Sequence, residues 1–403
     1  MGGIFSNLVV LELAGVLAGP SVGQFFAELG ARVIKLENPS TRGDVTRTWK
    51  MPGESSGDLS SYFHSCNWGK ESVAVNLKSD DGQAVMHDLA RKSDVIISNY
   101  IPRAARKLKA DYESFKALNP GVILGSIVGY SPESDRPGYD AIIQAEAGYY
   151  YINGDPQSPD WHPTKMPVPL MDILAGHQLK QALLIALIKK QMTGEGSQVT
   201  VSLFDSAVSA LTNQATSLLV AGQVPSPMGS EHPNIAPYGS VYRSKDGRNV
   251  VLAVGTDKQF ASLCELLHLP ELSTDPRFEK NADRVTHRKV LKGILQQAIS
   301  ELNRSPFLEA CERVGIPSGA VHRMDEVFEN TPAHVLLQNG DKQSRGIREC
   351  IAWPYFDQGI GSSLNDHVSA PPRYASSTKS VLADLLLYSD QKINELARNK
   401  AIE

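Results

Sequence analysis

The chain has 403 residues, of which 41% are hydrophobic and 21% charged, and its formal net charge at pH 7 is -4. This balance is typical of a soluble globular protein and excludes a disordered or strongly basic, nucleic-acid-binding chain. The length suggests two domains or one large domain with an inserted smaller one, and we expect no apolar run long enough to span a membrane. The four cysteines lack the paired spacing of a zinc site or a disulfide framework, so we expect a cytoplasmic protein without a metal site.

Strands and helices are predicted to alternate over the first third of the chain. Residues 7–13 and 30–37 have the composition of β-strands, and a helix over residues 22–29 connects them. Such a β-α-β unit requires parallel strands and a right-handed crossover. Further strands are predicted at residues 72–77, 94–98, 122–127 and 198–203. We therefore predict an α/β fold whose large domain is a Rossmann-like, doubly wound parallel sheet.

The first turn of this sheet is rich in small residues but does not fit a dinucleotide site. Gly15 and Gly19 lack the Gly-x-Gly-x-x-Gly spacing, and Pro20 removes an amide that a pyrophosphate could use. We therefore exclude NAD as a cofactor.

A proline- and glycine-rich segment, residues 221–230, marks the best internal boundary. Beyond it, a hairpin is expected around Lys245-Asp246-Gly247, followed by helices over residues 258–267 and 284–302. A last helix is predicted over residues 380–397. The predicted domains are residues 1–222 (first part of the large α/β domain), 223–314 (a smaller α+β domain) and 315–403 (a segment that returns to the large domain).

A single carboxylate, Asp172, follows a proline-stiffened apolar approach and opens a predicted long helix. We predict that it is the helix N-cap, because its oxygens can accept amides of the first turn. The same position lowers the pKa of a carboxylate, since the helix dipole and those amides favour the charged form. Two interpretations stay open at this point, namely an ordinary helix cap and an ionised nucleophile.

Several stretches, in order along nearly the whole chain, resemble the class III CoA-transferases, the family of formyl-CoA transferase and carnitine CoA-transferase. Each stretch alone would be a weak signal, whereas their order makes the resemblance specific. The matching stretches are residues 10–13, 17–20, 30–37, 43–47, 67–70, 103–108, 118–120, 136–140, 193–196 and 275–278.

The resemblance implies that Asp172 is the catalytic nucleophile. Its carboxylate would attack an acyl-CoA thioester, and an aspartyl anhydride and then an aspartyl-CoA thioester would pass CoA to a carboxylic acid acceptor. The resemblance also implies acyl-CoA and coenzyme A as substrates, no tightly bound cofactor, a role in acyl-CoA metabolism, and an interlocked homodimer. We expect neither nucleic acid nor a membrane as a partner.

The resemblance also implies a CoA site at the ends of the predicted strands. CoA carries phosphates, so cations are expected at the crevice of the sheet, and Tyr139 is expected near the reacting carbonyl. Any of these residues could instead be a surface charge or part of a turn or core. The expected CoA contacts are Val16, Leu17, Ala18, Lys35, Lys70, Arg103, Arg106 and Tyr139.

Two other functions remain to be weighed. An α-methylacyl-CoA racemase of this fold has a histidine immediately before the aspartate that here is Asp140, whereas this chain has Tyr139, a poor base near neutral pH. A non-catalytic CoA-binding protein would not need Asp172. Departures from formyl-CoA transferase at Leu17 and Asn38 argue against formate and oxalate, so the acceptor stays open, and residues 232–238 resemble a loop that could cover the site.

Overall fold

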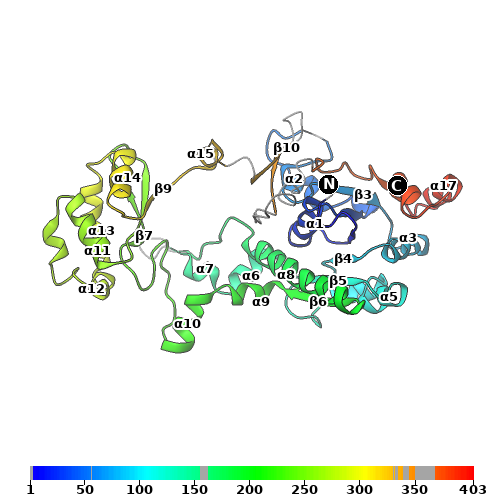
Figure 1. The fold of residues 1–403 in the computed structure, drawn as a ribbon, viewed down its shortest axis with the longest axis horizontal. Helices are drawn as coiled ribbons and strands as arrows, with labels where there is room; N and C mark the ends of the chain where they lie inside the picture. The colour runs from blue at the N-terminus through cyan, green and yellow to red at the C-terminus, as the bar shows by residue number, and fades with distance from the viewer. Residues whose placement is uncertain are drawn as a thin grey trace. The chain divides into compact units, whose positions relative to one another are not determined.

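The computed structural model describes residues 3–55, 57–154, 162–329, 331, 335–338, 345–349 and 368–403. The chain forms two compact units (Figure 1). The chain leaves the larger unit twice and returns to it twice, and the predicted smaller domain, residues 223–314, lies within the second excursion. The larger unit comprises Met1–Ala147, Pro167–Thr216 and Pro332–Glu403, and the smaller unit comprises Gly148–Met166 and Ser217–Thr331.

The described part of the larger unit contains a six-stranded sheet in the order β3-β2-β1-β4-β5-β6. All of its pairs are parallel, which confirms the α/β fold predicted from the alternating strands and helices. In this order the progression along the sheet reverses between β1 and β4, and doubly wound folds bind their ligands at that point. The strands are β1 Val9–Glu12, β2 Arg32–Glu37, β3 Lys70–Ala74, β4 Val95–Ser98, β5 Ile123–Val128 and β6 Ser197–Ser202.

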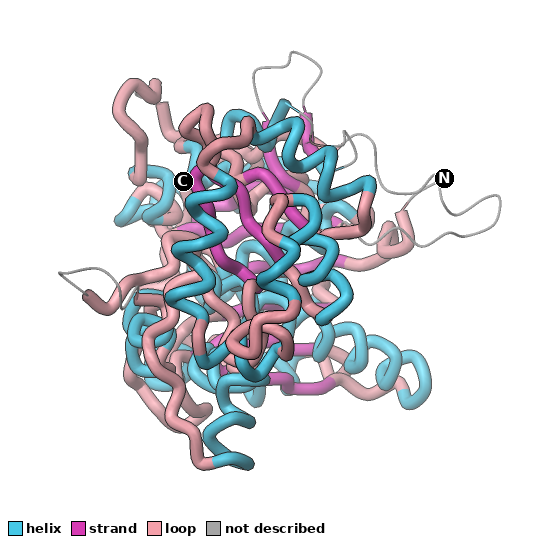
Figure 2. The backbone as a smooth tube through the Cα atoms, turned by 90° about the vertical axis from the view of Figure 1, so that its left-hand side faces the viewer, coloured by secondary structure: helices cyan, strands magenta, loops and turns pink. Residues whose placement is uncertain are grey.

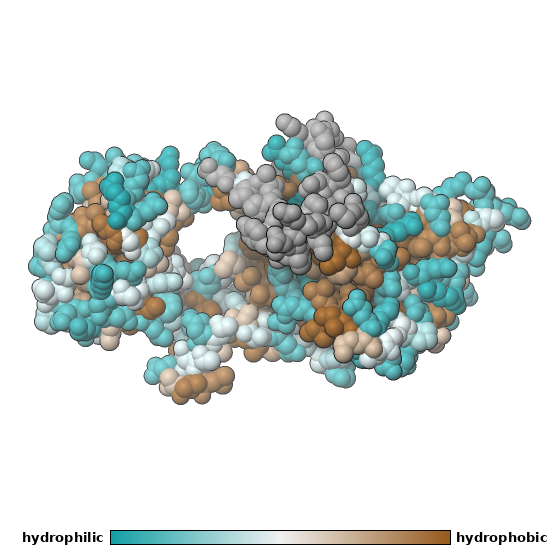
Figure 3. Space-filling model, in the orientation of Figure 1, coloured by the Kyte–Doolittle hydropathy of each residue, from teal (hydrophilic) through white to brown (hydrophobic). Residues whose placement is uncertain are grey.

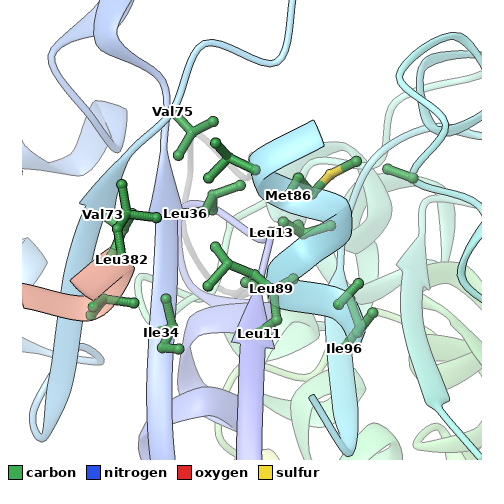
Figure 4. Close-up of a cluster of buried hydrophobic side chains, with 14 of the residues drawn as sticks. Leu11, Leu13, Ile34, Leu36, Val73, Val75, Met86, Leu89, Ile96 and Leu382 are labelled. Atoms are coloured by element: carbon green, nitrogen blue, oxygen red, sulfur yellow. The ribbon is translucent and has the colours of Figure 1, made fainter. Parts of the chain in front are cut away.

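Helices cover both faces of this sheet (Figure 2). On one face, apolar side chains of β1, β2 and β3 meet Met86 and Leu89 of α3, as Figure 4 shows. On the other face, α1 and α8 pack together against the strands. The helices of the larger unit include α1 Ala18–Glu28, α2 Ser61–His64, α3 Asp80–Arg91, α4 Pro102–Lys107, α5 Tyr112–Leu118, α6 Asp140–Glu146, α8 Leu170–Thr193, α9 Leu203–Ser209, α16 Thr378–Asp384 and α17 Asp390–Arg398, with short 3-10 turns at Pro39–Thr41 and Val45–Thr48.

Helix α8 corrects the expectation that no apolar run is long enough to span a membrane. It has 24 residues, and an 18-residue window of it reaches a mean hydropathy of 1.2. By length and composition it could cross a bilayer, but core helices of soluble proteins meet the same criterion. Because α8 packs against β5, β6, α1 and α9, its buried apolar residues belong to the core.

The smaller unit contains an antiparallel three-stranded sheet in the order β7-β8-β9, surrounded by helices. The predicted hairpin is confirmed, with β7 at Tyr238–Arg243 and β8 at Asn249–Ala253. The predicted helix over residues 284–302 is interrupted at His287, and α12 ends there before α13 begins. The remaining elements are α7 Tyr149–Ile152, α10 Thr212–Ala221, α11 Asp257–Leu266, η3 Pro270–Ser273, α12 Asn281–Thr286, α13 Arg288–Ile299, α14 Arg304–Arg313, β9 Ser318–Ala320 and α15 Met324–Glu329, while β10 Leu336–Gln338 and β11 Arg345–Ile347 pair within the larger unit.

Gly23 of α1 provides a test of the packing between α1 and the sheet. A Cβ atom at this position would overlap Oε2 of Glu12, which is fully buried and bound by two lysines. Because that carboxylate cannot move aside without breaking its ion pairs, Gly23→Ala should lower the free energy of unfolding by about 1–3 kcal/mol, measured by chemical denaturation. The control is Gly293→Ala in α13, where a Cβ meets no atom within 4 Å, and where we expect no loss of stability. Equal effects at the two positions would contradict this packing.

Candidate functional site

A cavity of about 360 Å³ lies where the strand order reverses, at the carboxyl ends of β1, β4 and β5. Five of the residues predicted from the sequence line it together, namely Val16, Leu17, Ala18, Tyr139 and Asp172. Tyr139 is 67% exposed and precedes α6, whereas Asp172 is half-buried. We call this space the Asp172 cavity, and residues 15–18, 99–101, 127–129, 134, 137–140, 172 and 203 form its lining.

The first turn of α8 positions Asp172, but Asp172 is not the helix cap that we predicted. Pro169 is the N-cap of α8 and makes no side-chain capping bond, so Asp172 is the third helical residue. The sequence-based start was too late, because Pro169 fixes its own φ near a helix-compatible value and allows the helix to begin at Leu170. Asp172 therefore still lies within the first turn, where the helix dipole stabilises negative charge.

A second carboxylate, that of Asp140, bonds the start of α8. Its Oδ1 accepts the amide of Met171 at 2.9 Å, and its Oδ2 accepts a hydrogen bond of 2.8 Å from Nε2 of Gln144. The buried Gln144 also donates to the carbonyl of Val168 at 3.4 Å. The residue next to the catalytic candidate is thus tied to a neighbouring helix, and both carboxylates, Asp140 and Asp172, line the same cavity.

Tyr62 does not line the Asp172 cavity, but it is close enough for the charge of Asp172 to act on it, and the sequence analysis did not select it. It lies on α2, in a stretch where the sequence analysis predicted neither a strand nor a helix, and its ring packs edge-on against Trp49 with 5.0 Å between the centroids. Burial and the negative charge of Asp172 together raise the pKa of Tyr62 to about 12. The phenol is therefore neutral at physiological pH and can donate a hydrogen bond near Asp172. The available sequence signal was Ser60, which caps α2 by accepting the amide of Phe63.

The turn after β1 that lines the cavity has an unusual backbone. Val16 has a φ of 71°, in the left-handed region, which is a rare conformation for a β-branched residue and costs about 1–3 kcal/mol. Its amide donates to Oδ2 of Asp44 at 3.1 Å and to Oδ1 at 3.3 Å. The side chain of Asn99 bonds both backbone groups of Gly15, the residue before Val16. It accepts the Gly15 amide at 3.2 Å and donates to the Gly15 carbonyl at 2.8 Å. The surrounding structure thus fixes this turn.

Lys35, which the sequence analysis expects to contact CoA, is not among the residues that line the Asp172 cavity. Its Nζ lies 2.9 Å from Glu12 Oε1 and 2.9 Å from Asp44 Oδ2, and it donates to the carbonyl of Ala14 at 2.8 Å. An ammonium has three donors, and all three are used. Burial alone would lower the pKa of Lys35, but the carboxylates around it outweigh that effect and raise the pKa. Lys35 therefore stabilises the turn after β1 from inside the protein.

Lys70, the second lysine expected to contact CoA, is also absent from the lining of the Asp172 cavity. Its Nζ lies 2.8 Å from Glu12 Oε2 and donates to the carbonyl of Pro20 at 2.8 Å and to Oδ1 of Asn67 at 2.9 Å. The side chain is buried, and burial lowers the pKa of Lys70 more than Glu12 raises it. All three donors of Lys70 are thus used inside the protein, and its contact with CoA stays a prediction.

The two predicted arginines lie on α4, near the Asp172 cavity but outside its lining. Both are exposed, and the backbone amide of Arg103 donates to Oδ1 of Asp135 at 2.7 Å. Arg106 lines a second cavity of about 130 Å³, and Tyr100 lines both this cavity and the Asp172 cavity. Tyr100 also lines a third cavity, of about 140 Å³, together with Lys78, a cation that the sequence analysis did not select. These neighbouring cavities could accommodate an elongated ligand.

The loop of residues 232–238, which resembles a site-covering loop, is held firmly within the smaller unit. Arg288 donates to the carbonyls of His232 at 2.9 Å and Pro233 at 3.0 Å. The buried Arg284 donates to the carbonyl of Ala236 at 2.9 Å. The loop thus has a defined conformation, and its role as a cover stays a prediction.

Comparison with known proteins identifies clear relatives. The model of the family described as CoA-transferase family III matches residues 5–353. The chain is 37% identical over 350 residues to a succinate–glutarate CoA-transferase of Agrobacterium fabrum, covering 85% of this chain and 84% of that protein. It is 33% identical over 393 residues to the succinyl-CoA:glutarate CoA-transferase of Homo sapiens, and the match covers 96% of this chain and 87% of that protein.

A third relative and a solved structure extend the comparison. The chain is 35% identical over 345 residues to an acetyl-CoA:oxalate CoA-transferase of Acetobacter aceti, covering 84% of this chain and 86% of that protein. The crystal structure of a CaiB/BaiF family protein from Brucella suis has a TM-score of 0.81 and 34% identity, and the match covers 96% of this chain and 100% of that one.

Proposed function

Because the chain belongs to CoA-transferase family III, whose enzymes transfer CoA between acids, we propose that Asp172 carries this transfer as a covalent nucleophile. The observation that supports the proposal is the placement of its carboxylate. Asp172 lies in the first turn of α8, half-buried, in a cavity at the switch point of the sheet, and its charge acts on the neutral phenol of Tyr62.

The proposed reaction begins when Asp172 attacks the carbonyl carbon of the acyl-CoA thioester. The carbon–sulfur bond breaks, CoA leaves as the thiolate, and Asp172 is left as a mixed anhydride with the donor acyl group. The thiolate then attacks Cγ of Asp172 and expels the donor acid, which gives an aspartyl-CoA thioester. Dividing one difficult exchange into such steps is nucleophilic catalysis.

The second half of the reaction is the reverse with a different acid. The carboxylate of the acceptor attacks Cγ of Asp172 and expels the CoA thiolate, which forms a second anhydride. The thiolate attacks the acyl carbon of the acceptor, and the Asp172 carboxylate is released. Each oxyanion along this path needs hydrogen-bond donors, and the Tyr62 phenol and the amides of the turn after β1 are the candidates.

For the substrates, we propose short dicarboxylic acids and their CoA thioesters. The relatives named above act on succinate and glutarate or on oxalate by their names, and this class supports a dicarboxylate here. The described lining of the Asp172 cavity contains no lysine or arginine, so the second carboxylate would be bound outside this lining. Arg106 and Lys78, which line the neighbouring cavities, are the candidates for binding the phosphates of CoA.

A donor and acceptor panel tests the proposed function. The purified protein is incubated with succinyl-CoA or acetyl-CoA and with mono- and dicarboxylates, and the new CoA esters are quantified by chromatography and mass spectrometry. We expect a dicarboxylate pair to react with the highest kcat/KM. Deuterium entering the α-carbon from heavy water without CoA transfer would instead support the racemase alternative, and CoA binding without either reaction would support a non-catalytic protein.

Tyr62 should contribute one hydrogen bond to the transfer. Tyr62→Phe removes the phenolic hydroxyl and keeps the ring against Trp49, so we expect kcat to fall roughly tenfold, the equivalent of about 1.4 kcal/mol, with little change in KM for the acyl-CoA. The matched control is Tyr130→Phe, which removes a hydroxyl that donates to Glu146 at 2.7 Å; the charge of Asp172 acts on the phenol of Tyr62, whereas the charges that act on Tyr130 are those of Glu146 and Arg136. Equal kinetic effects of the two substitutions would exclude a specific role for Tyr62.

We also propose that the protein forms a homodimer. Helix α8 exposes Ile185, Ile188 and Met192, with Met192 80% exposed. The end of α10 exposes Leu219 and Val220, and Figure 3 shows apolar side chains gathered there. Large apolar side chains that are exposed in groups on one helix, as on each of these two, are typical of interaction surfaces. Light scattering coupled to size-exclusion chromatography should give twice the mass of the chain, and a monomer at micromolar concentration would contradict the proposal.

A further inference from the structure

The left-handed conformation of Val16 needs an explanation that goes beyond the cavity lining. A valine with a φ of 71° is strained, because its branched Cβ crowds the backbone, and an unrestrained valine would return to a negative φ. Val16 is followed by Leu17 and Ala18, which line the Asp172 cavity and begin α1. The orientation of the peptide groups in this turn therefore depends on whatever keeps Val16 in its strained state.

Asp44 is the side chain that bonds the strained residue directly. Both of its carboxylate oxygens accept the amide of Val16, at 3.1 and 3.3 Å. A change of φ at Val16 would redirect the flanking peptide groups and break these bonds. Asp44 lies on a different segment of the chain, so its carboxylate can hold the turn in place from outside it. We call this contact between Asp44 and Val16 the clamp.

Asp44 is itself held from several sides. Its Oδ1 accepts the amide of Thr46 at 3.0 Å and the hydroxyl of Thr46 at 2.8 Å, and its Oδ2 lies 2.9 Å from Nζ of Lys35. Its own amide donates to Oε1 of Glu37 at 2.8 Å. The side chain is buried, and although burial favours the neutral acid, Lys35 and the Thr46 bonds lower the pKa of Asp44. The carboxylate is thus charged and fixed where it meets Val16.

We propose that Asp44 is a positioning residue for CoA transfer, which holds Val16 in the left-handed conformation and thereby sets the peptide groups that line the Asp172 cavity. This inference rests on the proposed function of Asp172. Asp44 does not belong to the described cavity lining and acts only through the turn. The buried lysine Lys35, which bonds both Asp44 and the carbonyl of Ala14, completes the support on the other side of the turn.

If Asp44 holds Val16 in its left-handed conformation, Val16→Gly should remove most of the effect of Asp44→Asn on kcat. An ordinary buried ion pair would not predict this dependence. Glycine adopts positive φ without strain, so a chain with glycine at position 16 should not need the clamp. The test is a double-mutant cycle of Asp44→Asn and Val16→Gly, with kcat and KM measured for the best donor and acceptor pair. We expect Asp44→Asn to lower kcat at least about tenfold in the chain with Val16, and no more than about twofold in the chain with Val16→Gly.

A matched control separates the clamp from a general loss of stability. Asp94 also bonds a backbone amide and a lysine, accepting the amide of Val9 at 3.2 Å and lying 3.0 Å from Nζ of Lys190. It precedes β4, whereas the cavity lies beyond the carboxyl end of that strand. Val16→Gly should not change the effect of Asp94→Asn on kcat. Rescue of both aspartate variants, or equal effects of Asp44→Asn in both backgrounds, would overturn the inference.

Two further measurements keep the test decisive. If Asp44→Asn fails to fold, Asp44→Glu keeps the charge for Lys35 but moves the acceptor oxygens, and the same rescue by Val16→Gly is expected for it. The starting protein is assayed first, for CoA transfer and for CoA binding by calorimetry. No transfer by that protein would reject the proposed function, whereas transfer with an additive cycle would reject the clamp alone.

Discussion

Replacing Asp172 with asparagine is expected to lower kcat for CoA transfer about 10⁴-fold or more while leaving the affinity for CoA within about twofold. Asparagine has nearly the same shape and fits the third position of a helix, so α8 and the cavity should persist. Its amide nitrogen, however, cannot attack a thioester to form an anhydride. Steady-state transfer assays and calorimetric titration with CoA check the two parts of this expectation.

The chain offers a closely matched control for Asp172. Asp205 is the third residue of α9, as Asp172 is of α8, but it is exposed and does not line the cavity. Asp205→Asn therefore removes the same charge from the same helical position and should leave kcat within about twofold. Substantial transfer by the Asp172→Asn protein would show that another group is the nucleophile.

Replacing Asp140 with alanine is expected to produce the second largest loss, with kcat lower by about 100-fold. The variant leaves the amide of Met171 without its partner and frees the first turn of α8, so the carboxylate of Asp172 loses its exact placement. Loss of a capping bond should also lower the free energy of unfolding by about 1–2 kcal/mol. Kinetics and denaturation on the same protein measure both effects.

The conservative variant Asp140→Asn distinguishes positioning from proton transfer. Asparagine keeps an oxygen that can accept the Met171 amide, and it is as good a cap as aspartate. We therefore expect Asp140→Asn to retain at least about tenfold more activity than Asp140→Ala. Equal losses would indicate that the charge of Asp140 takes part in the chemistry, as a racemase mechanism would require.

The sheet could be predicted from the sequence because its strands are apolar runs separated by amphipathic helices and turn residues. The helix boundaries were harder where the backbone departs from ordinary conformations. Helix α1 begins at Ala18, four residues earlier than predicted, because the left-handed Val16 turns the chain directly into the helix. The predicted helix over residues 380–397 is two helices, since Leu387 has a φ of 56° and Ser389 caps α17.

The candidate site was predictable only in part. Asp172 and the turn at residues 16–18 were found because the resemblance and the local pattern agree there, and the structure brings them to one cavity. Lys35 and Lys70 do not line this cavity, because Glu12 on β1 forms ion pairs with both of them, and a strand sequence does not show such contacts. Tyr62 was missed because the effect of Asp172 on its phenol joins two residues 110 positions apart in the sequence and arises only in the folded chain.

The most direct test of covalent catalysis is to trap the enzyme after reaction with an acyl-CoA donor in the absence of an acceptor. Hydroxylamine attacks an aspartyl anhydride or thioester at Cγ and leaves a hydroxamate on the aspartate, which peptide mass spectrometry locates. We predict a hydroxamate on Asp172 that depends on the donor and is absent from the Asp172→Asn protein. A protein that transfers CoA but carries the hydroxamate on another residue, or on none, would contradict the role of Asp172.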